Sequence, residues 1–157
     1  MAEGGVICVQ VAGAAYGLAV ADVQEVVGYR TPTRVFHAPP ALAGITSLRG
    51  EVLPIIDLAN LLEGPAEARP EPTEPRVVVV RERSGARRRA GLKVDALLGL
   101  REAPAAAQRD VPPAIAARLG DLVTGVVSEP EPAFALLSVA GILNATALRE
   151  LSGAAIE

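Results

Sequence analysis

The residues of this chain that could carry chemistry are few. It has one histidine, His37, and one cysteine, Cys8, so it cannot build a two-histidine metal site, a cysteine zinc cluster or an intrachain disulfide. Three aspartates, Asp22, Asp57 and Asp95, stand near the ends of expected strands. A small hydrolase or metal enzyme needs a clustered nucleophile, base or ligand set. Asp57 is better explained as a helix cap, and the other candidate residues do not cluster. The sequence therefore predicts no catalytic residue, no metal and no cofactor.

One arginine lies at a position where a partner protein could contact it. Residues 45–57, ITSLRGEVLPIID, set Arg49 and Gly50 between two apolar runs, which is typical of a β-hairpin. The turn needs the glycine and has no need of the arginine. The guanidinium therefore either solvates the turn or is displayed to something outside the chain.

Composition limits the class of protein. At 157 residues the chain suits one domain or two small halves, and 50% of it is apolar while 3% is aromatic, which predicts a core of Val, Leu, Ile and Ala. A net charge of −3 without a basic patch interleaved with aromatics argues against nucleic-acid binding. Residues 4–21 are uncharged, but Glu3 has the wrong sign for a signal peptide, so we expect a cytoplasmic protein that does not insert into a membrane.

Short apolar runs with turn residues between them predict a mostly-β fold. The expected strands are 6–12, 16–20, 23–30, 33–37, 44–48, 51–57, 76–83, 88–97, 98–103, 122–129 and 133–138. Short helices are expected at 58–64, at 113–120 and from Ser138 to about residue 151. The segment 63–75 is rich in proline and glutamate and predicts a loop or linker.

An internal repeat is the strongest organisational signal. A shift of 81 residues places LAGITSLRGEVLPIIDLANLL on VTGVVSEPEPAFALLSVAGIL without a gap. Gly44 then matches Gly125, and Asp57 matches Ser138 as a candidate cap. A weaker similarity within the chain aligns Gly17-Leu18 with Gly91-Leu92 at a different shift. Two copies predict a duplicated small barrel and not a solenoid.

The repeat bears on the hairpin tip. The first copy has Arg49-Gly50 where the second has Pro130-Glu131, so the shared architecture does not require the arginine. A residue that one copy has and the other lacks is a candidate for function. A tip held by local charge pairs is the alternative interpretation.

The segment 16–58 resembles the CheW-like adaptor proteins of bacterial chemosensory arrays. It reads YGLAVADVQEVVGYRTPTRVFHAPPALAGITSLRGEVLPIIDL, against a family pattern of YGI, V-x-E-I, a proline, G, LRG and P-x-x-D-L in order. The likeness continues through AGLKVDALLGL at 90–100 and LVTGVV at 122–127. It implies two intertwined five-stranded SH3-like barrels that share a core, with a few short helices and a C-terminal helix.

The resemblance also implies domain boundaries. Residues 1–157 would form a single CheW-like domain, with about 14–64 as the first barrel and 65–75 as a linker loop. About 76–138 would form the second barrel, which the strand 6–12 could join, and 139–151 a C-terminal helix.

The implied function is that of a non-catalytic scaffold. Such adaptors couple the cytoplasmic tips of methyl-accepting chemoreceptors to the regulatory domain of the histidine kinase CheA, and we expect the isolated chain to be monomeric. One alternative is a CheW-like adaptor of a non-chemotaxis pathway that binds only one of these partners. Another is a small ligand-binding β-barrel, which the dense Val, Leu and Ile content and scarce aromatic lining disfavour.

The family's motifs assign interaction residues one by one. The LRG arginine is Arg49, with Gly50 as its turn residue and Gly44 opening the strand before it. The V-x-E element is Val23 and Glu25, which in relatives lie near the surface that faces receptor and kinase. Core packing for Val23, and a solvated charge or an ion pair with Arg49 for Glu25, are the alternatives.

Two further features complete the expectations. A receptor tip is a helical hairpin, so Val23, Val26 and Val94 are expected beside an apolar groove between the barrels. The run RERSGARRR at 81–89 departs from the family and predicts an exposed basic hairpin, either tuned to an acidic partner or simply solvated.

Overall fold

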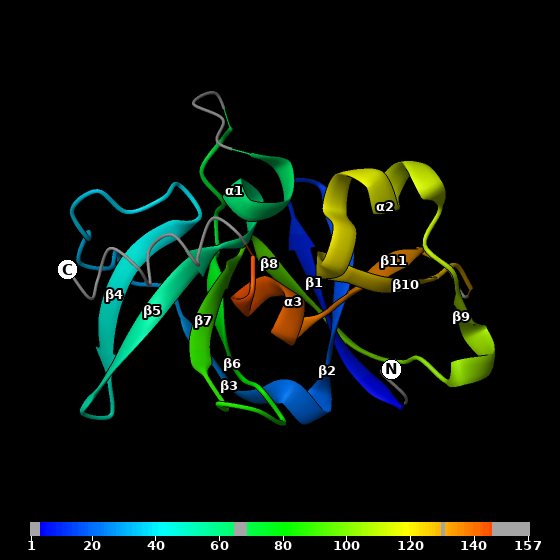
Figure 1. The fold of residues 1–157 in the computed structure, drawn as a ribbon, viewed down its shortest axis with the longest axis horizontal. Coiled ribbons are helices and arrows are strands. Elements are labelled where there is room, and N and C mark those ends of the chain that lie inside the picture. The colour runs from blue at the N-terminus through cyan, green and yellow to red at the C-terminus, as the bar shows by residue number, and fades with distance from the viewer. Residues whose placement is uncertain (1–3, 65–68, 130, 146–157) are drawn as a thin grey trace.

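Two sheets make up the computed structural model, which describes residues 4–64, 69–129 and 131–145 (Figure 1). We call the six-stranded sheet module A; its order is β8 (Ala96–Glu102), β1 (Gly5–Val11), β2 (Ala14–Ala19), β11 (Phe134–Leu137), β10 (Val123–Val127) and β9 (Gln108–Arg109). Module B is the five-stranded sheet, in the order β3 (Val23–Gly28), β6 (Arg76–Arg81), β7 (Arg89–Val94), β5 (Glu51–Asp57) and β4 (Leu42–Leu48). The short helical segments are η1 (Val20–Asp22), α1 (Leu58–Glu63), η2 (Ala105–Ala107), α2 (Pro113–Leu119), η3 (Gly120–Leu122) and α3 (Val139–Leu143).

The expected mostly-β fold of two intertwined modules is confirmed, with a sixth strand, β9, in one of them. The first hairpin of each half of the chain is inserted into the sheet formed by the remaining strands of the other half. The β1–β2 hairpin lies between β8 and β11, and the β6–β7 hairpin lies between β3 and β5. Each inserted hairpin pairs antiparallel with its host on one side and parallel on the other, where Gly17 lies opposite Leu136 and Gly91 opposite Ile55.

This exchange corrects the expected partition of the chain. The segment 76–94 was expected in the second barrel, yet β6 and β7 pair with strands of module B. Conversely, β2 was expected in the first barrel but pairs with strands of module A. β1 also lies in module A, in line with the expectation that the strand 6–12 could join the second barrel. Parallel pairing across a long sequence separation is not visible in local patterns, which explains the error.

The repeat is present in the geometry. In β4–β5 the register shifts between Leu42 and Gly44, and in β10–β11 it shifts at the corresponding place, between Val123 and Gly125. Each second strand ends in a cap. The Asp57 carboxylate accepts from the Asn60 N–H at 3.1 Å, and the hydroxyl of Ser138 accepts from the N–H of Gly141 at 3.0 Å.

Because glycine has no side chain, another segment of the backbone can approach closely at each register shift. Thr33 forms a bridge with Ile45, and a Cβ on Gly44 would overlap the carbonyl oxygen of Thr33. In the second copy Arg109 of β9 pairs with Val126, and a Cβ on Gly125 would lie 3.3 Å from the Arg109 carbonyl oxygen. Gly44 is therefore a packing residue of module B.

Three expected elements differ in the structure. The strand 33–37 is wrong: only the Thr33 bridge forms there, because prolines flank the segment and His37 takes a φ of +60°. The boundary between 88–97 and 98–103 moves to Asp95, whose carboxylate accepts from the Ala12 N–H at 2.9 Å. The C-terminal helix expected over 139–151 is observed as Val139–Leu143, and residues 146–157 lie outside the described part.

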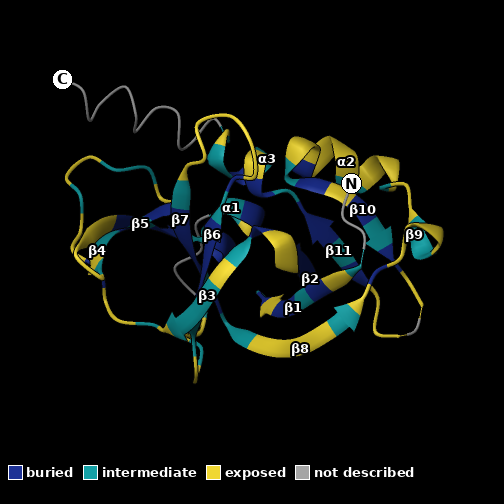
Figure 2. Ribbon diagram, turned by 90° about the horizontal axis from the view of Figure 1, so that it is seen from below, coloured by how far each residue is buried: buried dark blue, intermediate teal, exposed yellow. Residues whose placement is uncertain are grey.

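The largest core cluster lies between the modules. It joins Val9 and Leu18 of module A to Val78 and Leu92 of module B, all without exposed surface. Smaller clusters fill each module, one of which contains Cys8, buried and unpaired as predicted. Figure 2 shows this buried interior, with β8 exposed along one side.

The β6–β7 loop ties module B to the end of module A. Glu82, 9% exposed, accepts from the backbone N–H of Arg88 at 2.9 Å and from its Nε and Nη2 at 2.8 Å each. Arg88 also donates to the carbonyl oxygen of Leu143 at 3.1 Å and to Asn144 Oδ1 at 2.6 Å. The loop of one module therefore holds the last turn of a helix in the other.

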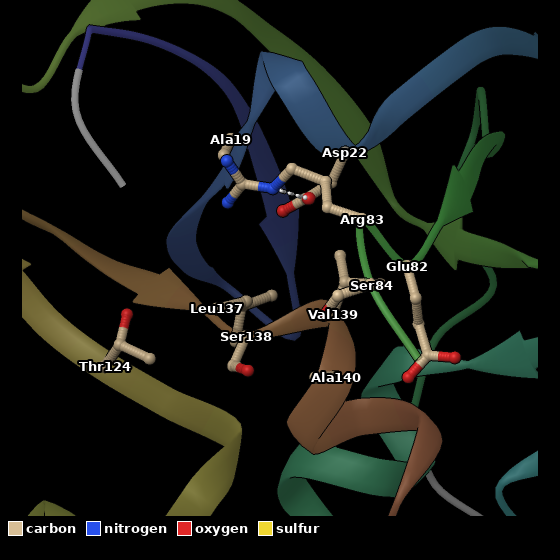
Figure 3. A pocket seen from close by; sticks show the side chains of 10 residues that line it. All are labelled: Ala19, Asp22, Glu82, Arg83, Ser84, Thr124, Leu137, Ser138, Val139 and Ala140. Carbon is tan, nitrogen blue, oxygen red and sulfur yellow. Dashed lines mark ion pairs between the residues drawn. The ribbon is translucent and has the colours of Figure 1, made fainter. Parts of the chain in front are cut away.

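A second pair lies at the same junction. Arg83 Nε is 2.6 Å from Oδ1 of Asp22 in η1, beside a cavity of about 210 Å³ (Figure 3). The basic hairpin expected at 81–89 is thus exposed, but Arg83 and Arg88 are neutralised within the chain.

We expect Gly44→Ala to lower the free energy of unfolding by about 2 kcal/mol or more, because the new methyl group must displace the backbone of Thr33. Gly125→Ala, at the equivalent place with a longer contact, should cost less. Urea unfolding of both variants checks this. Equal losses would show that the close approach of Thr33 is not what requires glycine.

The Glu82 pair predicts a pH dependence of stability. Hydrogen bonds from Arg88 hold the pKa of Glu82 below its ordinary value of 4.5. A pKa lowered by folding gives stability that is present above pH 4.5 and is lost as the pH falls through the lowered pKa. Glu82→Gln should therefore destabilise the protein by about 1 kcal/mol at neutral pH and by less near pH 3, in urea titrations at both pH values.

Glu74→Gln is the matched control, because Glu74 is exposed and pairs with Arg76 at 3.2 Å. It should change stability little at either pH. A loss for Glu82→Gln that is independent of pH would contradict a charge-based role for Glu82.

Candidate protein-interaction site

The tip of the β4–β5 hairpin displays Arg49. Leu48 pairs with Glu51 and closes a two-residue loop in which Arg49 has a φ of +52° and Gly50 a φ of +81°. Such loops favour Asn or Gly at the first position, since a larger side chain rarely adopts a positive φ. Arg49 is 72% exposed at this unfavourable position. The conformation of the turn therefore does not explain why an arginine stands at this position.

Glu25 holds the guanidinium in place. Arg49 Nη2 donates to Glu25 Oε1 at 2.6 Å and Nε donates to Oε2 at 3.1 Å, a bidentate pair. The hydrogen bonds from Arg49 lower the pKa of Glu25, and the same bonds raise the pKa of Arg49. The ion pair that the sequence left as an alternative for Glu25 is present.

The pair joins the two outer strands of module B. Glu25 lies on β3 and Arg49 follows β4, which stand at opposite ends of the sheet order. The same two strands line a cavity of about 410 Å³. The sheet is therefore curled until its edges face each other, and the pair bridges them.

A second polar contact extends the site. Arg89 Nη1 donates to Glu51 Oε2 at 2.5 Å, and its Nε donates to Gln24 Oε1 at 2.8 Å. Gln24 and Glu51 adjoin the first pair on β3 and on the β4–β5 hairpin, and Arg89 begins β7. We call the group Gln24, Glu25, Arg49, Glu51 and Arg89 the tip cluster.

The remaining predicted residues are placed as follows. Gly50 is exposed at the turn and Gly44 is buried. Val23 and Val26 are half-buried and pack against the central core. Val94 has no exposed surface, which corrects its assignment to a groove: its side chain belongs to the core.

Sequence reasoning missed the exposed apolar residues of β8. Leu97 is 42% exposed and Leu100 is 75% exposed. The structure shows that β3 and β8 are equivalent strands: the register of β3 shifts between Val23 and Glu25, and that of β8 shifts between Leu97 and Gly99. Leu97 and Leu100 thus occupy the places of Val23 and Val26 in the other half.

The aspartates do not converge. Asp22 pairs with Arg83, Asp57 caps α1, and Asp95 accepts from the Ala12 N–H. Within 4–64, 69–129 and 131–145 there is no group of three or more His, Cys, Asp or Glu side chains that could hold a metal. In the same ranges no helix is long and apolar enough to cross a membrane.

Comparison with known proteins connects this geometry to a family. The CheW-like domain model matches residues 5–147. Chemotaxis protein CheW of Klebsiella aerogenes is 46% identical over 43 residues, which cover 27% of this chain and 26% of the relative. Probable chemotaxis protein CheW of Rhizobium etli is 40% identical over 78 residues, covering 50% of this chain and 47% of the relative. The matched parts span at most about half the length of these curated relatives.

A solved structure agrees with the fold. The scaffolding protein TtCheW from Thermoanaerobacter tengcongensis superposes with a TM-score of 0.79 over 94% of this chain and 96% of that chain, at 23% identity. The family match over residues 5–147 and the shared architecture of two modules lead to one conclusion: this chain belongs to the CheW-like domain family.

Proposed function

We propose that this chain is a non-catalytic adaptor that couples methyl-accepting chemoreceptors to a CheA-type histidine kinase in a chemosensory pathway. The observation that carries the proposal is Arg49, exposed at a turn that disfavours it and held by Glu25 in a bidentate pair. The adaptor works in the cytoplasm at membrane-associated receptor arrays and is monomeric when isolated.

An adaptor of this kind needs two surfaces on one rigid body. The tip cluster offers a charged surface with an arginine anchor, a residue type enriched among binding hot spots. We assign it to the regulatory domain of the kinase. Because its guanidinium is already oriented by Glu25, little side-chain entropy is lost on binding.

The second surface is apolar. A receptor tip is a helical hairpin, which docks through apolar side chains with charges at the rim. Val23 and Val26 on β3 and their equivalents Leu97 and Leu100 on β8 supply such side chains from both exchanged halves. We assign these four residues to the receptor.

A CheW-like adaptor of a non-chemotaxis pathway, binding only one of the two partners, is the second candidate. The two surfaces distinguish it from the first, because an adaptor with one partner would use only one of them. Titrating the purified chain with a receptor tip fragment and with the kinase regulatory domain separates the two proposals.

Arg49→Ala should weaken binding of the kinase regulatory domain about thirtyfold, the cost of removing an interface hot spot. The melting temperature should change little, because exposed ion pairs contribute little to stability. Isothermal titration and a melting curve measure both. Arg34→Ala is the matched control, since Arg34 is also exposed and has no ion pair among the described residues. Unchanged affinity of Arg49→Ala for both partners would reject the anchor role.

Leu100→Ser should weaken binding of the receptor tip about tenfold and leave kinase binding unaltered, because it removes apolar contact area from the β8 surface alone. Phe36→Ser controls for the loss of an exposed apolar side chain, since Phe36 is 87% exposed on the β3–β4 loop. Fluorescence anisotropy with a labelled receptor fragment measures the affinities. Equal effects of the two substitutions would remove Leu100 from the receptor surface.

A further inference from the structure

A second concave site lies in module A, away from the tip cluster. Its volume is about 610 Å³, within the range of small-molecule sites. The walls are mainly apolar and come from the start of β2, the start of β11, β8 and α2; they include Ala15, Leu98, Ile115 and Phe134. Nothing in the adaptor function described above uses this cavity.

Tyr16 supplies a polar group to the cavity. The residue is 5% exposed, its ring belongs to the central core, and it lines the cavity. Its hydroxyl has no hydrogen-bond partner among the described residues, but it is not sealed from solvent and is open to the cavity. The hydroxyl of a largely buried tyrosine normally has a hydrogen-bond partner. A ligand in the cavity can provide one.

Two opposite charges lie at the same cavity. Arg118 of α2 contacts Glu63 of α1 through Nη1 and Oε2 at 3.4 Å, and the same Nη1 is 3.4 Å from the carbonyl oxygen of Leu62. Both distances exceed those of a strong charge-assisted hydrogen bond, about 2.7–2.9 Å. Burial raises the pKa of the Tyr16 phenol most, the charge of Glu63 raises it further and that of Arg118 lowers it, so all three groups lie within electrostatic reach.

We propose that this cavity binds a small neutral amphiphile whose head is an amide. The carbonyl oxygen accepts from the Tyr16 hydroxyl and from Arg118, the amide N–H donates to Glu63, and the apolar body lies against the walls of the cavity. A neutral head is favoured because the charges of Glu63 and Arg118 cancel, so neither an anion nor a cation gains a net attraction. The site would bind its ligand independently of receptor and kinase.

Three six-carbon probes test the head group: hexanamide, hexanoate and hexylammonium. Amide chemical shifts of the full chain are followed by ¹H–¹⁵N NMR at neutral pH. We expect saturable shifts with hexanamide at residues 14–16 and 133–135, and clearly weaker binding of the two charged probes. Tyr16→Phe, which keeps the ring, should weaken hexanamide about fivefold through the loss of one hydrogen bond.

Tyr29→Phe is the matched control, because Tyr29 is the other tyrosine of the chain and does not line this cavity. Arg118→Gln, at an exposed helix position, is a second variant that avoids the core and should also weaken hexanamide. The proposal is overturned if no probe shifts residues 14–16, if a charged probe binds as well as hexanamide, or if both Tyr16→Phe and Arg118→Gln bind hexanamide like the parent chain. Affinity for the receptor and kinase fragments should be the same in these variants, which separates this test from that of the adaptor function.

Discussion

The exchange of hairpins between the halves is the constraint on which the rest of the structure depends. The β1–β2 hairpin completes module A and the β6–β7 hairpin completes module B, so each sheet contains strands from both halves. The core between them, with Val9, Leu18, Val78 and Leu92 fully buried, belongs to neither module alone. Two modules that share their central core move as one body, which is what the proposed adaptor needs to hold two partners at a fixed spacing.

The Arg49–Glu25 pair joins the two edges of one sheet and also orients an exposed guanidinium. It spans the outer strands of module B, which the curl of that sheet brings together. At the same time it leaves the guanidinium exposed and pre-oriented at a turn. A side chain fixed in this way presents a fixed hydrogen-bonding geometry, which favours specificity over adaptability.

Local patterns predicted most elements and the repeat, because turn glycines, caps and alternation act over a few residues: Gly44 with Gly125 and Asp57 with Ser138 occupy equivalent positions in the structure. The exchange could not be found in this way, because the parallel pairing of Gly91 with Ile55 leaves no local signature. For the same reason Val94 was assigned to a surface, while the exposed places equivalent to Val23 and Val26 went unnoticed on β8. The sequence left several interpretations of Glu25 open, and an ion pair with Arg49 was one of them. The curl of the sheet, which brings the two residues together, decides among these interpretations.

The exchanged hairpins also bear on the origin of the chain. A polypeptide of half this length, carrying one hairpin followed by one set of host strands, would leave a gap in its own sheet. Two identical copies could each fill the gap of the other, giving a domain-swapped homodimer with closed two-fold symmetry. The segment between α1 and β6 would then be the fusion joint of an ancient dimer, and the hairpin-tip arginine, present in one copy alone, is a position at which the two halves are no longer interchangeable.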